Sequence, residues 1–222
     1  MNHTTTRWAG LAAAVTAIAA LVIAPLHALA RFGTGAGAAD DDSPLVAAWA
    51  EPARDAAGGL LTFASPDLVY LTYGKFWLIA LAAITACAYA FRSRRVGVRT
   101  GERWAWRLAL TGYTLMAAGS LVSYWTAFVD VGFAVFTLPG LLITLVGSTA
   151  LGVALLRARV RPSLTAWLLA LQIPLLVGFS SIGSFSTGAL PLVAAWGIAG
   201  WRLWRGVPAG SAATAPQQIR TA

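Results

Sequence analysis

Five polar side chains in this sequence lie within or beside long apolar stretches, at similar distances from clusters of arginine. Lys75, the only lysine, interrupts the apolar stretch that follows Ser65-Pro66. A charged side chain inside such a stretch is commonly functional, because placing it in a membrane is costly. Seventeen positions separate Lys75 from Arg92, or about 25 Å of helix. Lys75 therefore either extends its amine to water at the outer membrane interface or lines an outward pocket.

Other polar residues fall at the same depth when distances are counted from neighbouring arginines or helix starts. Tyr124 and Ser180 lie at this depth, and Ser184 and His27 lie slightly further out. If they converge, they form an outer polar pocket made of His27, Lys75, Tyr124, Ser180 and Ser184. In the alternative, these residues face different directions, and the serines bond to carbonyls of their own helices.

Most known catalytic and metal-binding patterns are missing. The chain has two histidines, His3 and His27, and only one of them lies in an apolar stretch, so a bis-histidine haem is excluded. It has no HExxH zinc motif and one cysteine, Cys87. Ser180 has no histidine in the following helix to activate it. We therefore expect no catalytic residue, no cofactor and no metal site, and an enzyme is the less favoured interpretation.

Composition indicates a membrane protein. The 222 residues are 58% hydrophobic and 11% charged, with a mean hydropathy of +0.71, whereas soluble domains are about a quarter charged. We expect an all-α membrane protein with a single transmembrane domain over residues 1–205. The six predicted transmembrane helices cover residues 8–30, 66–91, 104–128, 131–156, 163–182 and 188–204.

The connections are predicted from proline, glycine and polar residues. The external loop 31–65 should carry short surface helices, the first starting at Ser43-Pro44 and ending at Pro52, and Pro174 should kink the fifth transmembrane helix. The tail 206–222 is expected to be disordered and cytoplasmic. Residues 28–30 have the form of a signal-peptidase site. The length of the apolar stretch favours an uncleaved helix, and cleavage after Ala30 stays open.

Charge predicts the orientation. The net charge of +8 comes mainly from arginines at the ends of apolar stretches, which indicates membrane topology and not nucleic-acid binding. Only Arg31, Arg54 and Lys75 fall outside if both termini are cytoplasmic. We expect a multi-pass protein of the bacterial cytoplasmic membrane. Trp49, Tyr70 and Trp125 should form an outer aromatic belt.

Small residues four apart predict a helix-packing ridge. Gly140, Thr144, Ser148 and Gly152 share one helical face, which another helix can approach closely. Gly112 and Gly119 are the expected facing surface. Gln172, near the predicted mid-membrane, should act in hydrogen bonding between helices.

Three classes of function stay open. The favoured one is a non-catalytic envelope or regulatory protein that acts through helix packing with a membrane-protein partner or by self-association, within the lipid bilayer. A small-solute carrier or channel is the alternative, although no mid-membrane acid and no internal repeat support it. A third is an outer-leaflet enzyme that uses Lys75 and Tyr124.

Overall fold

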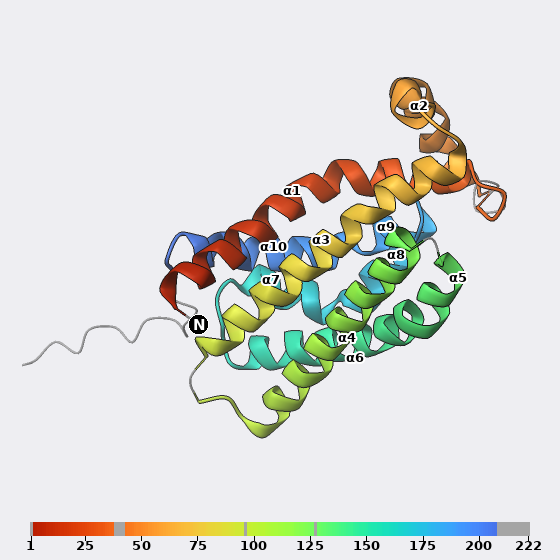
Figure 1. Cartoon of the computed structure of the whole chain (residues 1–222). Coiled ribbons are helices and arrows are strands. Elements are labelled where there is room, and N and C mark those ends of the chain that lie inside the picture. The colour runs from red at the N-terminus through yellow and green to blue at the C-terminus, as the bar shows by residue number, and fades with distance from the viewer. Residues whose placement is uncertain (1, 38–42, 96, 127, 208–222) are drawn as a thin grey trace, which may run out of the picture.

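The computed structural model describes residues 2–37, 43–95, 97–126 and 128–207. Every regular element in these ranges is a helix (Figure 1). The all-α prediction is therefore confirmed for this part of the chain. The predicted tail lies outside the described residues from 208 onward, as do residues 38–42 of the external loop.

Three helical segments are long and apolar enough to cross a membrane: α1 (His3–Phe32), α3 (Pro66–Ser93) and Val129–Arg157. The last consists of α5 (Val129–Val131), a π-helical segment η2 (Gly132–Thr137) and α6 (Leu138–Arg157). The helices α7 (Ser163–Ala170) and α8 (Gln172–Ser181) form a fourth candidate that bends by 69°. The remaining elements are α4 (Thr100–Trp125), α9 (Phe185–Gly188) and α10 (Leu190–Trp204).

The bend between α7 and α8 has a local cause. It falls at Leu171, three residues before Pro174. Proline lacks the N–H that would bond to the carbonyl four residues earlier, here Ala170, and its ring clashes with that carbonyl. Gln172 follows the bend directly and is buried, but its Oε1 accepts no hydrogen bond from the described residues.

The long helices close into a ring. Helix α1 packs on α3, α3 on α4, α4 on α6, α6 on α7, α7 on α10, and α10 returns to α1 (Figure 1). The α1–α10 contact is close because Gly10 and Gly200 face each other, and a Cβ on either would overlap the other's backbone. This order brings the first and last long helices together.

In the described residues of the loop 31–65, one helix continues where the sequence predicted a short helix that ends at Pro52. Helix α2 runs over Pro44–Leu61 and continues through Pro52. The carbonyl of Ala48 loses its helical donor at Pro52, but both residues are exposed, so water can supply one. The starts of α2 and α3 at Pro44 and Pro66 fit the sequence, although no hydroxyl cap from Ser43 or Ser65 forms.

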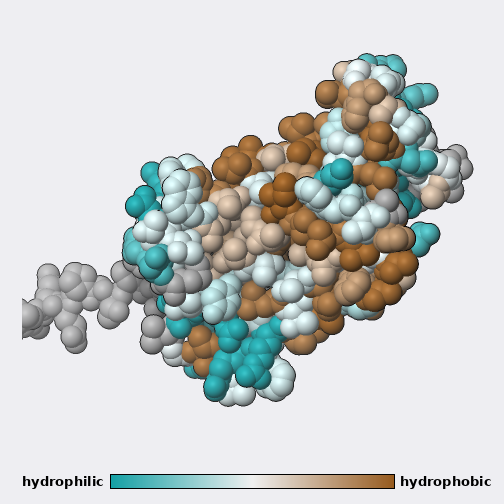
Figure 2. Space-filling view, in the orientation of Figure 1, coloured by the Kyte–Doolittle hydropathy of each residue, from teal (hydrophilic) through white to brown (hydrophobic). Residues whose placement is uncertain are grey.

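The bundle has two unlike ends. At one end lie the N-terminus of α1, the C-terminus of α10 and the turns that join α3 to α4 and α6 to α7. We call it the arginine-rich end. Glu102 lies there too, bonded to Arg95 at 3.2 Å. At the other, the α2 end, lie Glu51, Asp55, Asp67 and Asp130. Figure 2 shows hydrophobic residues over the middle of the visible face and hydrophilic ones towards its ends. The arginines of the first end are Arg7, Arg92, Arg94, Arg95, Arg99, Arg103, Arg107, Arg157, Arg159, Arg161, Arg202 and Arg205.

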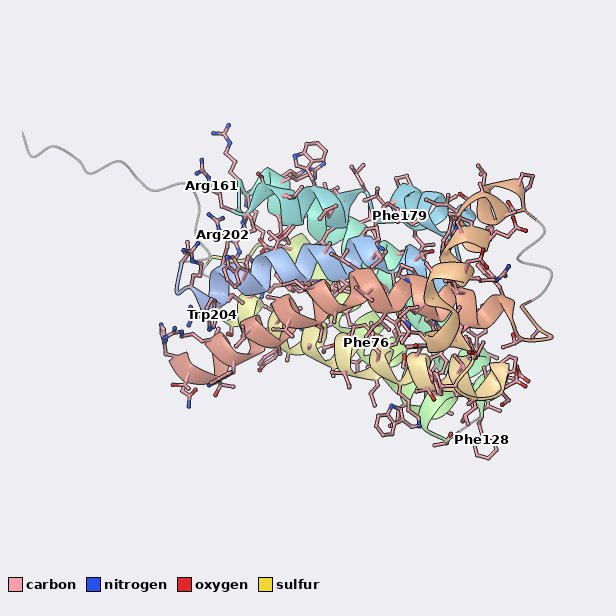
Figure 3. The ribbon with its side chains drawn as sticks, turned by 90° about the horizontal axis from the view of Figure 1, so that it is seen from above. Phe76, Phe128, Arg161, Phe179, Arg202 and Trp204 are labelled. Atoms are coloured by element: carbon pink, nitrogen blue, oxygen red, sulfur yellow. The ribbon has the colours of Figure 1, made fainter. Side chains whose placement is uncertain are left out.

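A second view of the structure shows labelled residues at the two ends of the bundle. In Figure 3, Arg161, Arg202 and Trp204 mark the arginine-rich end, and Phe128 and Phe179 lie towards the α2 end. This separation follows the distribution of charge expected for a protein that crosses a bilayer.

The core contains a closed polar network. Trp196 donates its Nε1–H to the hydroxyl of Tyr113 at 3.1 Å, and Tyr113 lies 2.7 Å from the Ser148 hydroxyl. Since tryptophan only donates, the Tyr113 hydroxyl accepts from Trp196 and is free to donate to Ser148. Phe91 and Trp106 pack on Trp196 with centroids 6.2 and 5.9 Å away. We call Phe91, Trp106, Tyr113, Ser148 and Trp196 the core cluster.

The predicted packing ridge lies inside the chain. Thr144 and Ser148 are buried against Gly112 and Tyr113 of α4. Gly152 lies against the backbone of α7 at Ala170, and Gly140 faces Met116 of α4. Gly119 faces η2 instead of the ridge. The ridge is therefore used for packing within the chain, so its surface is not open to a partner.

A candidate binding cavity at the α2 end

One face of α3 supplies the floor of a cavity. Tyr70, Gly74, Trp77 and Leu81 follow one another at three- and four-residue spacing, so they share a helical face. Trp77 and Leu81 are buried, and together with Tyr70 they line a cavity of about 640 Å³. Residues from α1, α4, η2 and the α8–α9 turn complete its wall. The cavity lies towards the α2 end of the bundle, and Val46 of α2 is part of its lining.

His27 lies at the centre of an aromatic box. Its ring stacks on Tyr70 with centroids 4.7 Å apart and an interplanar angle of 16°. Tyr124 meets it edge-on at 5.4 Å, and Trp77 does so at 6.3 Å. His27 is 4% exposed, so these rings hold the imidazole in one orientation. We call His27, Tyr70, Trp77 and Tyr124 the cavity cluster.

Hydrogen bonding assigns the tautomer of His27. Trp77 donates its Nε1–H to Nδ1 of His27 at 3.3 Å. Because Nδ1 accepts, a neutral imidazole carries its proton on Nε2, which is then a donor. Nε2 is buried and has no hydrogen-bond partner among the described residues. His27, which lines the cavity, therefore carries an oriented and buried N–H group that no described protein atom satisfies.

Tyr124 reaches the cluster because Gly74 has no side chain. A Cβ at Gly74 would overlap the Tyr124 ring, so the ring packs directly on the α3 backbone. Its hydroxyl lies 3.2 Å from that of Tyr70. The absence of a side chain at Gly74 therefore allows Tyr124 to reach the cavity cluster.

Hydroxyl groups line the side opposite α3. Ser184 caps α9, and its hydroxyl lies 2.7 Å from that of Ser186, which in turn donates to the Ala24 carbonyl of α1. The Ser180 hydroxyl packs against Gly188 and has no partner among the described residues. Ser180, another lining residue, thus carries a second buried and unsatisfied polar group, whereas the Ser184 hydroxyl is used in the α9 cap.

Helix α2 and two charged residues border the cavity. Val46 and Ala50 of α2 pack on Leu29 and Phe32 of α1, and Trp49 donates to the carbonyl of Ile182 at the end of α8. These contacts attach α2 to α1 and to the end of α8 beside the cavity. Arg31 and Asp130 are also part of the lining, so both signs of charge occur at its edge.

Lys75 is not part of this lining. Its side chain is exposed, and its Nζ lies 5.6 Å from the centroid of the Trp125 ring. At 100° per residue, Lys75 points roughly 130° away from the α3 face that bears Tyr70 and Trp77. The structure therefore brings His27, Tyr124, Ser180 and Ser184 to one cavity and leaves the predicted fifth member outside it.

Two residues of the cavity cluster were not predicted as site residues. Tyr70 was assigned to the outer aromatic belt, and Trp77 was counted only as part of an apolar stretch. A signal for both residues is their seven-residue spacing on the helical face that also contains Gly74. A glycine flanked by aromatic residues indicates that another helix approaches this face closely.

The described residues of the cavity contain no recognisable metal-binding group. Within the ranges that the structure describes, no three histidine, cysteine, aspartate or glutamate residues are grouped to hold a metal ion. Comparison with known proteins finds no matching family, and no curated protein or solved structure matches the chain. The interpretation of the cavity therefore depends on its own geometry.

Proposed function

We propose that this chain is a six-span, non-catalytic membrane protein that binds a small organic molecule in the cavity at its α2 end. The observation that carries the proposal is the buried, unpartnered Nε2–H of His27, a residue that lines the cavity. The binding serves a regulatory or sensing role in the bacterial cytoplasmic membrane, with both termini in the cytoplasm. The proposal keeps the regulatory class of function that the sequence favours. It assigns that function to the cavity and no longer to the helix-packing ridge.

The energetics favour a bound partner for this group. A buried donor left unsatisfied costs about 1–3 kcal/mol, and nearly all buried polar groups in native proteins have a partner. A polar cavity of this size is filled by water when it is otherwise empty. A ligand that displaces this water and accepts from Nε2–H gains affinity if its oxygen reproduces the hydrogen bond.

The lining specifies the chemistry of the ligand. Tyr70, Trp77, Tyr124, Phe133 and Phe185 offer aromatic surfaces that suit a flat ring. The Nε2–H group requires an acceptor, and the Ser180 hydroxyl can bond a second oxygen. The expected ligand is therefore a one- or two-ring molecule with a carbonyl or similar oxygen.

A matched pair of compounds tests this binding. We expect 1-acetylnaphthalene to raise the melting temperature of the detergent-solubilised protein more than 1-ethylnaphthalene, which has the same size but no oxygen. His27→Phe should remove the difference between the two compounds. His3→Phe, which changes the chain's other histidine outside the cavity, should retain it. Equal shifts by both compounds on the unaltered protein would refute a role for the Nε2–H group.

A carrier is the second candidate, because of the bend between α7 and α8. Broken helices near the membrane midplane often form solute sites in transporters, and Gln172 lies buried at this break with an unsatisfied Oε1. A cysteine in place of Gln172 can be labelled selectively, since Cys87 is buried. Labelling by an impermeant maleimide from both sides of the membrane would favour the carrier, and labelling from neither side would oppose it.

The number of spans and the orientation need their own test. Both α4 and α10 complete the ring of helices, and the proposal places them across the membrane with the other four. We expect a reporter fused at Gly97, between α3 and α4, to read as cytoplasmic, because this turn lies among arginines. An external signal at Gly97 would reverse the proposed orientation.

A further inference from the structure

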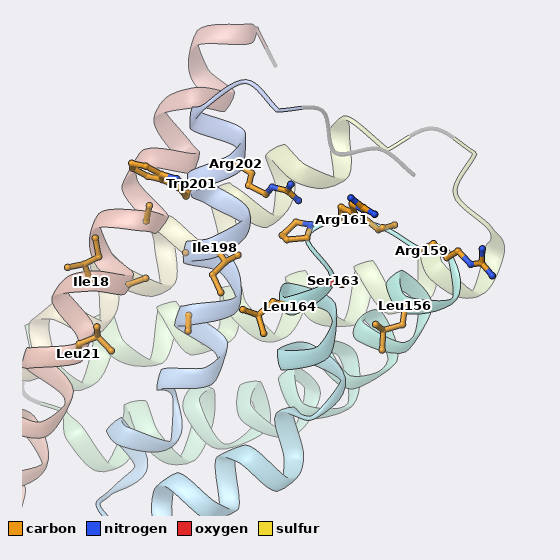
Figure 4. A pocket seen from close by; sticks show the side chains of 16 residues that line it. Ile18, Leu21, Leu156, Arg159, Arg161, Ser163, Leu164, Ile198, Trp201 and Arg202 are labelled. Carbon is orange, nitrogen blue, oxygen red and sulfur yellow. The ribbon is translucent and has the colours of Figure 1, made fainter. Parts of the chain in front are cut away.

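A second hollow lies at the arginine-rich end, on the outside of the bundle. It is a groove of about 1,120 Å³ between α1, α10 and the start of α7. Ile18, Leu21, Leu164 and Ile198 line it, and Figure 4 shows them along its length with Arg161 and Arg202 at its end. The groove is thus apolar along its side and basic at one end, unlike the cavity under α2.

The turn between α6 and α7 exposes its arginines for a structural reason. Arg159 has a left-handed backbone (φ 50°), and the N–H of Val160 bonds to the carbonyl of Leu155 at 3.0 Å. This is a Schellman ending, in which the residue after the left-handed position packs back on the helix. Val160 is accordingly buried, and Arg159 and Arg161 on either side of it are exposed.

These arginines have no acidic side chain beside them among the described residues. Glu102 is the one described acid at this end, and it is bonded to Arg95 and to Trp106. No described carboxylate therefore pairs with Arg161 or Arg202, and an anion from another molecule can bind there. Trp201, which also lines the groove, is 44% exposed, as expected for tryptophan at the level of lipid headgroups.

We propose that this groove holds one anionic phospholipid from the leaflet at the arginine-rich end. Arg161 and Arg202 bind the phosphate, and an acyl chain lies along Ile198, Ile18 and Leu21. From Arg202 to Ala194 the groove extends about 12 Å into the apolar layer, the length of the first eight or so carbons of an acyl chain. Basic pockets between transmembrane helices are suited to such headgroups. The site is separate from the cavity under α2, so neither proposal depends on the other.

Native mass spectrometry of the full chain with defined lipids tests the proposal. We expect phosphatidylglycerol to be retained more strongly than phosphatidylcholine with the same acyl chains. Arg161→Gln with Arg202→Gln should lower phosphatidylglycerol retention by about fivefold per arginine removed. Arg94→Gln with Arg99→Gln removes the same charge from the same end outside the groove and should leave retention unchanged. An equal loss in both double variants would overturn the site in favour of a diffuse basic rim.

A second pair of variants tests the groove itself. Ala194→Phe fills the apolar part of the groove and should reduce retention of both lipids, whereas Ala82→Phe, on exposed α3 surface, should not. Unchanged retention in Ala194→Phe would show that no acyl chain lies there. A dimer of the unaltered protein that Ala194→Phe dissociates would assign the groove to a second copy of the chain and overturn the lipid proposal.

Discussion

Two clusters in this molecule are built from the same kinds of residue and differ in how their polar groups are satisfied. In the core cluster, Trp196 donates to Tyr113, which bonds to Ser148. In the cavity cluster, Trp77 donates to His27 and the two tyrosine hydroxyls pair, but Nε2 of His27 has no described partner. The core network is closed within the protein, and the cavity network is open.

This difference distinguishes residues that pack the core from residues that are proposed to bind a ligand. The side chains of Trp106, Tyr113 and Trp196 are fully buried, so their hydrogen bonds serve the fold and no ligand can reach them. The cavity cluster lines a volume of about 640 Å³, and the proposed function places a ligand there beside the unpartnered Nε2 of His27. The same residue types therefore stabilise the fold in one place and, in the proposed function, select a ligand in the other.

Replacing a closely packed glycine by alanine should give the largest effect on stability, and Gly152 and Gly74 allow the two regions to be compared. In Gly152→Ala the new Cβ overlaps the backbone of α7 at Ala170, which cannot move separately, and we expect a loss of about 1–3 kcal/mol or more in stability. In Gly74→Ala it overlaps the Tyr124 ring, which can shift into the cavity. Thermal unfolding in detergent measures the first effect, and loss of the acetylnaphthalene response measures the second. A Gly74→Ala protein as unstable as Gly152→Ala would contradict the distinction.

Removing one hydroxyl from each cluster sharpens the comparison. Tyr113→Phe leaves the buried Nε1–H of Trp196 without its acceptor, and should cost about 1–3 kcal/mol. Tyr124→Phe removes a bond beside a roomy cavity, where water can replace the hydroxyl, and should cost less than about 1 kcal/mol. Chemical denaturation of both variants under identical detergent conditions compares them directly. The ranking fails if Tyr124→Phe is the more destabilised.

Lys75→Met should have the smallest effect. The substitution removes the contact of Lys75 with Trp125, worth about 0.5–1 kcal/mol at an exposed site, and also removes the cost of keeping a charge near the apolar layer. We expect a near-unchanged melting temperature and an unchanged response to acetylnaphthalene. A lost ligand response would place Lys75 in the site after all.

Several features could be predicted because they depend only on local chemistry. The apolar stretches predicted the helical class, Pro44 and Pro66 marked helix starts, and Pro174 indicated a break in the fifth helix. The continuation of α2 through Pro52 could not be predicted, because it depends on which carbonyls face water. The packing of α2 against α1 decides which of its carbonyls face water.

The sequence by itself determined how far along its helix each polar residue lies, and the tertiary structure decided the direction in which its side chain points. A helix rises 1.5 Å per residue whatever surrounds it, so counting from the arginines was enough to group His27, Lys75, Tyr124, Ser180 and Ser184 by depth. The rotation of each helix about its axis depends on which faces pack together. In α3 the face with Tyr70, Gly74 and Trp77 turns towards α1 and α4, and the Tyr124 ring packs over Gly74, where a Cβ would overlap it. That packing brought His27 against Trp77 and directed Lys75 outward.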